Sequence, residues 1–210
     1  MKKTWVSEDK SQKYIGEFDG ENKHGQGTYF WIGLLEISGK FENDELPNYG
    51  TIIKYDDYEY IGEMKNRDGR FNGKGILKSL NPKFTYEGEF KNGELDGYGI
   101  LTQDSGIYEG DFKKGLKHGK GTIKAGFLRT GEKKGQKFIV DGGPLTGKFE
   151  NDIPVGIFIW EMTSGRRYVG EINKGGYPEG KGTLTHPDGE VEKGIFKNGE
   201  LIQPSQSRER

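Results

Sequence analysis

The side chains of this chain that could serve in catalysis stand in turn-like contexts. His24 and His118 each precede a glycine at equivalent places in a repeated phrase, and His186 lies in the tetrapeptide HPDG. Asp104 and Ser105 also precede a glycine, and Asp-Ser-Gly is ordinary turn chemistry. Catalytic and metal sites need several side chains that converge, so these scattered residues predict no catalytic residue, no metal and no cofactor. We therefore expect a protein that is not an enzyme.

A glycine-rich segment with lysines, GLKHGKGT at 115–122, resembles a phosphate-binding loop in outline. In such a loop a serine or threonine follows the lysine, and a helix begins whose N-terminus binds the phosphate. Gly121 follows Lys120 instead, and no helical pattern comes after it. The segment is therefore rejected as a phosphate site.

A basic segment at 122–144 is the candidate site for an anionic ligand. It carries five cations, Lys124, Arg129, Lys133, Lys134 and Lys137, against two acids, Glu132 and Asp141. Cations held near a charged membrane contribute about 1 kcal/mol each, so this segment could bind an anionic lipid or an acidic partner. The other interpretation is an extra hairpin with ordinary solvated lysines.

The run YDDYEY at 55–60 is acidic and aromatic. It could receive a basic peptide, or it could be a turn that leads into the next strand. Both interpretations are kept at this stage.

Composition excludes several classes of protein. The net charge is −1 with 31% charged residues, so there is no basic field of the kind that nucleic-acid binding requires. Cysteine is absent, which excludes disulfides and thiolate metal sites. No apolar run has the length of a signal peptide core or a membrane span. We expect a soluble protein of the cytoplasm that does not bind nucleic acid.

Glycines recur at a nearly constant step along the chain. Each stands in a phrase such as YIGEF, YEGDF or YVGEI, and most are 22–26 residues apart, with one step of 37 residues; they are Gly16, Gly39, Gly62, Gly88, Gly110, Gly147, Gly170 and Gly194. A repeat of this length is typical of arrays in which each unit buries its surface against its neighbours. The repeat predicts one array with no internal boundary.

Each repeat is predicted to form a β-hairpin. The phrase is followed by a polar turn and then by a second glycine pair, such as HGQG at 24–27 or DGYG at 96–99. Because side chains alternate between the faces of a strand, Tyr14, Gly16 and Phe18 share one face. We infer that aromatic rings lie over bare glycines of the next strand. The aromatic face predicted to bind a partner comprises Tyr14, Phe18, Tyr60, Tyr86, Phe90, Tyr108, Phe112 and Tyr168.

The opposite face is predicted to be solvated. Its acidic and basic side chains are expected to form ion pairs across each hairpin, namely Glu63 with Lys74, Asp111 with Lys120 and Glu171 with Lys181. Exposed pairs contribute at most about 1 kcal/mol each. They would therefore set the strand register more than the stability.

The phrase Y-x-G-E-F followed by a short turn and H-G-x-G or D-G-x-G resembles the MORN repeat (membrane occupation and recognition nexus), from Tyr14 to about Leu201. The resemblance implies an all-β fold, an elongated single-layer antiparallel β-meander of about eight hairpin repeats. It also implies a non-enzymatic protein-binding scaffold in a cytoskeletal, ciliary or membrane-adjacent assembly. In family members with a helical partner, that helix lies along the aromatic groove.

Three repeats depart from the pattern. Ile37 and Ser38 replace the Tyr-x pair in the second repeat, where Asn48 stands in place of a glycine. In the sixth, Leu145 replaces tyrosine and Phe158 replaces the second glycine. These changes predict that the aromatic strip is interrupted there. The eighth repeat has Glu192 in place of tyrosine, shows no second strand, and is expected to be a polar cap.

These observations divide the chain into an N-terminal segment or cap at 1–13, the repeat array at 14–201 and a disordered tail at 202–210. The leading hypothesis is a scaffold whose aromatic groove binds a protein partner, such as an amphipathic helix. The alternative is a peripheral membrane or phosphoinositide-binding adaptor that acts through the basic insertion. Self-association through the unpaired ends of the sheet is a further expectation.

Overall fold

The computed structural model describes residues 2–54, 57–65, 69–124, 129–133, 136–140 and 142–205. The chain divides into two compact units, residues 1–103 and 104–210, which are described separately. The regular elements in the described ranges are all β-strands, which confirms the predicted all-β fold. Within these ranges no helix is long and apolar enough to cross a membrane.

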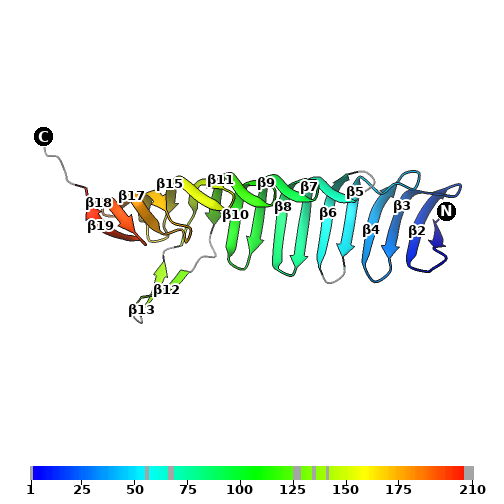
Figure 1. Cartoon of the computed structure of the whole chain (residues 1–210), viewed down its shortest axis with the longest axis horizontal. Helices are drawn as coiled ribbons and strands as arrows, with labels where there is room; N and C mark the ends of the chain where they lie inside the picture. The colour runs from blue at the N-terminus through cyan, green and yellow to red at the C-terminus, as the bar shows by residue number, and fades with distance from the viewer. Residues whose placement is uncertain are drawn as a thin grey trace. The chain divides into compact units, whose positions relative to one another are not determined.

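The first unit is an antiparallel meander in which each strand pairs with the next one in the sequence. Figure 1 shows these strands side by side, from blue at β1 to green at β9. Strand β1 precedes four hairpins, β2–β3, β4–β5, β6–β7 and β8–β9. The strands are β1 (Lys2–Val6), β2 (Gln12–Asp19), β3 (Asn22–Trp31), β4 (Leu35–Phe41), β5 (Tyr49–Lys54), β6 (Tyr58–Lys65), β7 (Arg70–Leu80), β8 (Lys83–Lys91) and β9 (Glu94–Gln103).

The second unit contains another four hairpins of the same kind, β10–β11, β14–β15, β16–β17 and β18–β19. Consecutive hairpins pair with one another through β11–β14, β15–β16 and β17–β18. The two units together thus contain eight hairpins of the repeat array in the described residues, as predicted. The strands are β10 (Gly106–Lys113), β11 (Leu116–Lys124), β12 (Arg129–Lys133), β13 (Gln136–Val140), β14 (Leu145–Glu150), β15 (Ile153–Glu161), β16 (Arg167–Ile172), β17 (Pro178–Thr185), β18 (Val191–Lys197) and β19 (Glu200–Pro204).

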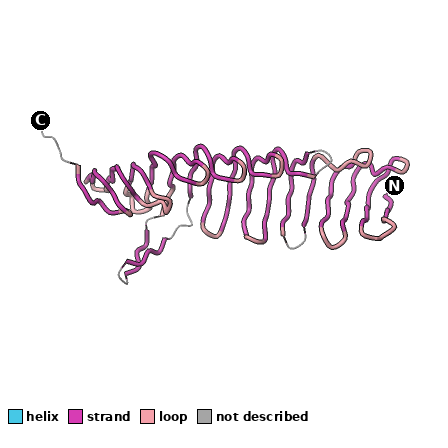
Figure 2. Tube along the Cα trace, viewed as in Figure 1, coloured by secondary structure: helices cyan, strands magenta, loops and turns pink. Residues whose placement is uncertain are grey.

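The insertion predicted at 122–144 contains a separate two-stranded sheet. Its strands β12 and β13 pair only with each other in the part of the chain that is described. Figure 2 shows this hairpin apart from the meander strands of its unit. The extra-hairpin interpretation of the insertion therefore agrees with the backbone.

Short turns close the hairpins because their residues adopt left-handed backbone conformations. Asn92 and Gly93 have φ values of 53° and 90°, and Asn198 and Gly199 have 50° and 90°. Positive φ at two successive residues defines the tight turn that matches the twist of paired strands. In these two hairpins the Asn-Gly dipeptide thus fixes where the strand reverses.

Strands extend beyond the predicted array at both ends. Strand β1 lies within residues 1–13, and β19 continues past Leu201 to Pro204, inside the segment predicted to be a disordered tail. The prediction that the eighth repeat lacks a second strand was therefore wrong. The prediction relied on the glycine pair that follows the turn in other repeats. Strand β19 lacks that pair, but its backbone still pairs with β18, because ladder hydrogen bonds do not depend on the side chain.

Candidate partner-binding faces

A tyrosine ring covers two glycines in each typical repeat. The Tyr86 ring lies over Gly88 of its own strand and Gly99 of the next strand, so closely that a β-carbon on Gly99 would overlap it. The α-carbons of these two glycines face each other in the ladder. The same arrangement recurs under Tyr14, Tyr60, Tyr108 and Tyr168. The inference that rings lie over bare glycines is therefore confirmed.

A β-bulge follows the glycine and brings the backbone to the tyrosine hydroxyl. In β8 the register shifts between Gly88 and Phe90, and the Tyr86 hydroxyl donates a 3.0 Å hydrogen bond to the Glu89 carbonyl. The hydroxyls of Tyr14, Tyr60, Tyr108 and Tyr168 make the same bond to the carbonyl three residues later. Burial raises the pKa of Tyr86 to about 12. The tyrosine thus fixes the bulge as well as filling space.

In three repeats the acid after the glycine, Glu17, Glu63 or Asp111, contacts the facing backbone rather than a lysine side chain. Glu63 Oε1 accepts a 3.1 Å hydrogen bond from the Lys74 backbone nitrogen, and Asp111 Oδ2 accepts one of 3.0 Å from that of Lys120. The predicted residue partners are correct for these two hairpins, but the kind of contact was wrong. The predicted pair of Glu171 with Lys181 stays a prediction. The bulge turns each carboxylate toward the first glycine of the turn exit, where the neighbouring amide lies within reach.

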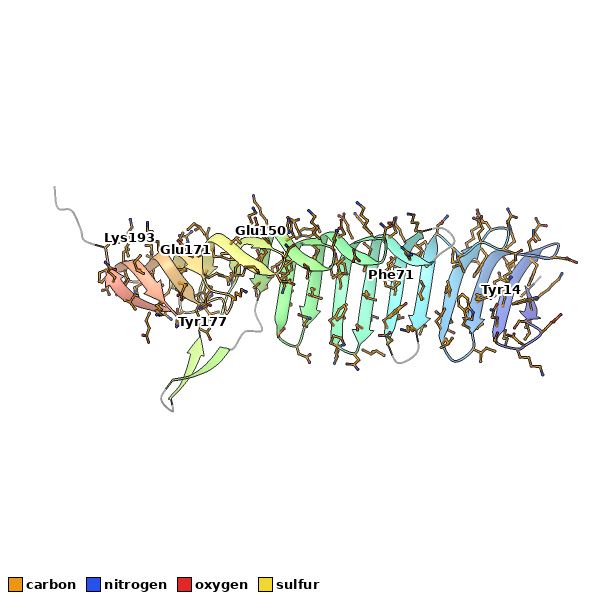
Figure 3. All side chains as sticks on the ribbon, viewed as in Figure 1. Tyr14, Phe71, Glu150, Glu171, Tyr177 and Lys193 are labelled. Carbon is orange, nitrogen blue, oxygen red and sulfur yellow. The ribbon has the colours of Figure 1, made fainter. Side chains whose placement is uncertain are left out.

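Aromatic rings pack on one another from repeat to repeat. The Tyr60 ring stacks on Phe71 with centroids 3.9 Å apart and meets Phe90 edge to face at 5.2 Å. In the second unit Tyr108 meets Phe112 at 5.1 Å and Phe149 at 5.4 Å. Such edge-to-face pairs contribute about 0.5–1.5 kcal/mol beyond the area they bury. Figure 3 labels Phe71 and Tyr14 among these rings.

The residues predicted to form the partner-binding aromatic face are almost all buried. Tyr14, Tyr60, Tyr86 and Tyr168 have 0% of their surface exposed, and Tyr108, Phe90 and Phe112 have 3–4%. Phe18 is half-buried and packs edge to face on Tyr14 at 5.2 Å. The structure therefore brings these rings together as a core. Their contact with a partner stays a prediction.

The sixth repeat keeps its aromatic strip, so the predicted interruption there was wrong. Phe158 is fully buried and its ring covers Gly147, the position that tyrosine covers elsewhere. It meets Phe149 edge to face at 5.3 Å. The ring comes from the second strand of the hairpin instead of the first, which is why Leu145 can stand where tyrosine is usual. Two departures from the pattern thus compensate each other.

The second repeat replaces the ring by proline. Pro47 is fully buried, and a β-carbon on Gly39 would lie 2.6 Å from the Pro47 β-carbon. Ile37 and Ile52 are paired across β4 and β5 and are each 3% exposed. Aliphatic residues and proline therefore take the place of the ring that covers the glycines, and the row of such rings is interrupted here as predicted. Phe41 of the same repeat stays fully buried and meets Tyr14 edge to face at 4.9 Å.

The face opposite the tyrosines carries an apolar groove in the first unit, although it was predicted to be solvated. The groove has a volume of about 450 Å³ and is lined by Ile61, Ile76, Ile100 and the exposed Tyr49 and Tyr98, among others; we call it the isoleucine groove. Isoleucines occupy positions beside the glycines, where their side chains point away from the tyrosines. The charged residues on the same face, such as Glu63 and Lys74, had suggested that the whole face is polar.

A second groove, of about 290 Å³, lies on the second unit and has a different charge. It is lined by Ile157, Val169, Ile195, Lys181 and Lys193, with five glycine, threonine and serine residues. Lys193, labelled in Figure 3, and Lys181 are its charged residues. The isoleucine groove instead includes three glutamates and one lysine. The two grooves therefore differ in the sign of the charge that lines them.

Of the five cations predicted to bind an anionic ligand, only Lys124 has a described side chain. Its ammonium forms an ion pair with Glu109. The side chains of Arg129, Lys133, Lys134 and Lys137 lie outside the described residues. The anionic-ligand site stays a prediction.

The remaining candidate residues do not converge on a common site in the described part of the chain. In the run at 55–60, Asp57 accepts a 2.6 Å hydrogen bond from Lys54, and β6 begins at Tyr58, as the turn interpretation requires. His186 Nε2 lies 2.7 Å from Glu192. The buried Nδ1 atoms of His24 and His118 have no hydrogen-bond partner among the described residues. The described part of the chain contains no group of three or more potential metal ligands.

Comparison with known proteins identifies the repeat. The profile of the MORN repeat family matches residues 14–32, 86–107, 108–124 and 168–191. The chain carries MORN repeats. Each match begins at one of the tyrosines Tyr14, Tyr86, Tyr108 and Tyr168, whose rings cover the glycines. MORN repeats are non-catalytic scaffold repeats that serve interactions with proteins and membranes.

Two curated relatives contain a region similar to most of this chain. Alsin of Rattus norvegicus and alsin of Mus musculus are each 25% identical to it over 163 residues. That region is 77% of this chain and 8% of each relative. The similarity therefore concerns the repeat array and not alsin as a whole.

Proposed function

We propose that this MORN-repeat chain is a non-enzymatic scaffold that binds a protein partner. The observation that carries the proposal is the exposed apolar surface on the face opposite the tyrosines. Ile76 and Ile100 in the first unit are each 37% exposed, and Ile157 and Ile159 in the second are 57% and 37% exposed. Exposed apolar side chains gathered in a groove commonly mark an interaction site.

The proposed contact surface differs from the one expected from the sequence. Rings such as Tyr86, with no exposed surface, offer a partner nothing to touch. We therefore assign the contact to the opposite face and give the aromatic ladder the role of holding that face rigid. Rigid presentation lowers the entropy lost on binding. The proposed setting is a cytoskeletal, ciliary or membrane-adjacent assembly in the cytoplasm.

Affinity purification followed by mass spectrometry tests the scaffold proposal. The full chain and its Ile76→Glu/Ile100→Glu variant are compared, with Leu80→Glu as the control because Leu80 is also exposed, at 62%, and does not line the groove. We expect partners that the parent and the control retain and the double variant loses. Recovery of the same proteins with all three would contradict the proposal. Turnover in a panel of hydrolase substrates would contradict the non-enzymatic assignment.

The alternative adaptor function rests on the separate hairpin β12–β13, which contains Arg129, Lys133 and Lys137. We compare the full chain with Lys133→Glu/Lys134→Glu/Lys137→Glu by co-sedimentation with vesicles that contain an anionic phosphoinositide. Binding that falls with added salt and is lost in the variant would support a membrane adaptor. Unchanged sedimentation would remove this alternative.

Self-association through sheet ends is a further proposal. The five residues of β1 are exposed, and among described strands β1 pairs with β2 alone in its unit. An unpaired strand edge can add a strand from a second copy. The Ser7 amide donates to the Gln12 carbonyl of β2, so by alternation the Thr4 amide points to the free edge. Sedimentation velocity over a range of concentrations tests self-association, and Thr4→Pro should abolish any dimer because proline removes that backbone donor. A monomer at every concentration would contradict it.

A further inference from the structure

We propose that the isoleucine groove of the first unit binds a basic amphipathic helix of the partner protein, laid across strands β6 to β9. This inference rests on the proposed scaffold function and specifies its ligand. It concerns a surface that lies within residues 49–100 and therefore within one unit.

The groove runs across the strands and not along them. In the register, Ile61 of β6 faces Ile76 of β7, and Glu87 of β8 faces both Ile76 and Ile100 of β9. Neighbouring strands are about 4.8 Å apart, so this row is about 14 Å long. A helix advances about 5.4 Å per turn. Roughly ten residues of helix therefore match the row, with an apolar side chain for each isoleucine.

The groove offers side chains and no free backbone. Strands β6, β7 and β8 are hydrogen-bonded to a neighbour on both sides. An extended peptide lying across them could not pair its own amides and carbonyls with the sheet, and burying those groups unpaired is costly. A helix satisfies its backbone internally and buries only side chains. The orientation of the groove thus favours a helix over a strand.

Charge determines the kind of helix. The charged residues lining the groove are Glu63, Glu87, Glu89 and Lys74, which are three carboxylates against one ammonium. Glu87 is exposed and stands in the row between Ile76 and Ile100. Lysines or arginines beside the apolar stripe of the helix would complement this charge. An acidic helix or an anionic lipid surface would be repelled.

The test uses a labelled synthetic helix of about 14 residues, with leucines on one face and lysines on the other. A matched peptide carries glutamate in place of every lysine. Fluorescence anisotropy measures binding of both peptides to the full chain. We expect the lysine peptide to bind and the glutamate peptide to bind at least about tenfold more weakly.

Charge reversal in the groove distinguishes a site from general attraction. Glu87→Lys should lower the affinity of the lysine peptide about tenfold and raise the affinity of the glutamate peptide. Glu21→Lys makes the same charge change at an exposed turn of the same unit and should change neither affinity. Lys193→Glu changes the groove of the second unit. It should not weaken binding of the lysine peptide, because that peptide binds the isoleucine groove. Circular dichroism and thermal unfolding verify that each variant is folded.

Equal loss with Glu87→Lys and Glu21→Lys, or equal binding of both peptides to the parent chain, would overturn the proposal. The scaffold function is judged by a different measurement, the recovery of cellular partners through Ile76 and Ile100. If partners are recovered through these residues while the lysine peptide does not bind, the groove binds protein and its ligand is not a basic helix.

Discussion

The Tyr86 hydroxyl donates a 3.0 Å hydrogen bond to the backbone carbonyl of Glu89, three residues further along the same strand. This bond joins the ring that covers the glycines to the bulge that turns the strand. One side chain therefore contributes to stability in two ways, through the packing of its ring on the glycines and through the hydrogen bond of its hydroxyl to the bulge. The two contributions can be measured separately.

Removing the hydroxyl of Tyr86 should cost less than removing the ring. Tyr86→Phe loses one part-buried hydrogen bond to the Glu89 carbonyl, which lowers the free energy of unfolding by about 1 kcal/mol. Tyr86→Ala also leaves a cavity and should cost about 3–5 kcal/mol. Urea unfolding followed by circular dichroism gives both values. Tyr49→Phe, at a 62% exposed side chain, is the control and should be near neutral; equal losses for both Phe variants would contradict the structure.

A methyl group on Gly99 should destabilise the chain although its backbone conformation suits any residue. The new β-carbon would overlap the Tyr86 ring, and overpacking of this kind costs about 1–3 kcal/mol. Gly142→Ala is the matched control, because its β-carbon would have its nearest neighbour, a Thr163 methyl, at 3.4 Å. Thermal unfolding compares them. A neutral Gly99→Ala would show that the ring does not press on this glycine.

The sixth repeat should tolerate a paired exchange better than either single change. Phe158→Gly uncovers Gly147 and should cost about 3–5 kcal/mol, whereas Leu145→Tyr adds a second ring where Phe158 already lies. The double variant restores the usual tyrosine-over-glycine arrangement. We expect a favourable coupling of about 1–3 kcal/mol in a double-mutant cycle. Additive losses would mean that Phe158 does not substitute for the tyrosine.

Stability should fall at alkaline pH. Burial raises the pKa of Tyr86 and Tyr168 to about 12 and also raises those of Tyr14, Tyr60 and Tyr108. Tyrosine in an unfolded chain has a pKa of about 10. Above that pH the unfolded chain releases protons that the folded chain keeps. The buried phenols therefore contribute their whole stabilisation below pH 10, and the free energy of unfolding declines from pH 10 toward pH 12.

Urea midpoints at several pH values between 8 and 11, with tyrosinate absorbance in parallel, measure this decline. Tyr86→Phe should make it shallower, because one of the buried phenols is gone. A constant midpoint with all tyrosines ionising near pH 10 would contradict the burial of the rings.

Much of the architecture follows from the sequence because its signals are local and repeated. The glycine phrases predicted the eight hairpins, and strand alternation predicted that Tyr86 covers Gly99. The carboxylate contacts were missed, although a signal was present. The acid after the glycine recurs as Glu17, Glu63 and Asp111, while the facing residue varies among Gln26, Lys74 and Lys120. A constant acid opposite a variable side chain indicates a constant partner, which is the backbone amide.

The candidate groove was harder to predict. Ile61, Ile76 and Ile100 are far apart in the sequence, and they become one surface only through the register of four strands. The ring of Phe158 was missed for a related reason, since its place over Gly147 depends on pairing between strands. Patterns within one strand show which face a residue occupies, but not which residues of other strands lie beside it.

Sequential pairing of the strands in the first unit has a consequence for how such chains change over time. Each of its strands pairs with the one next to it in the sequence, and each typical hairpin brings its own ring and glycines. Duplication or deletion of one whole hairpin would therefore alter the number of strands by a fixed increment while the remaining hairpins keep their pairing. Repeat number is thus a variable that selection can adjust without redesigning the fold.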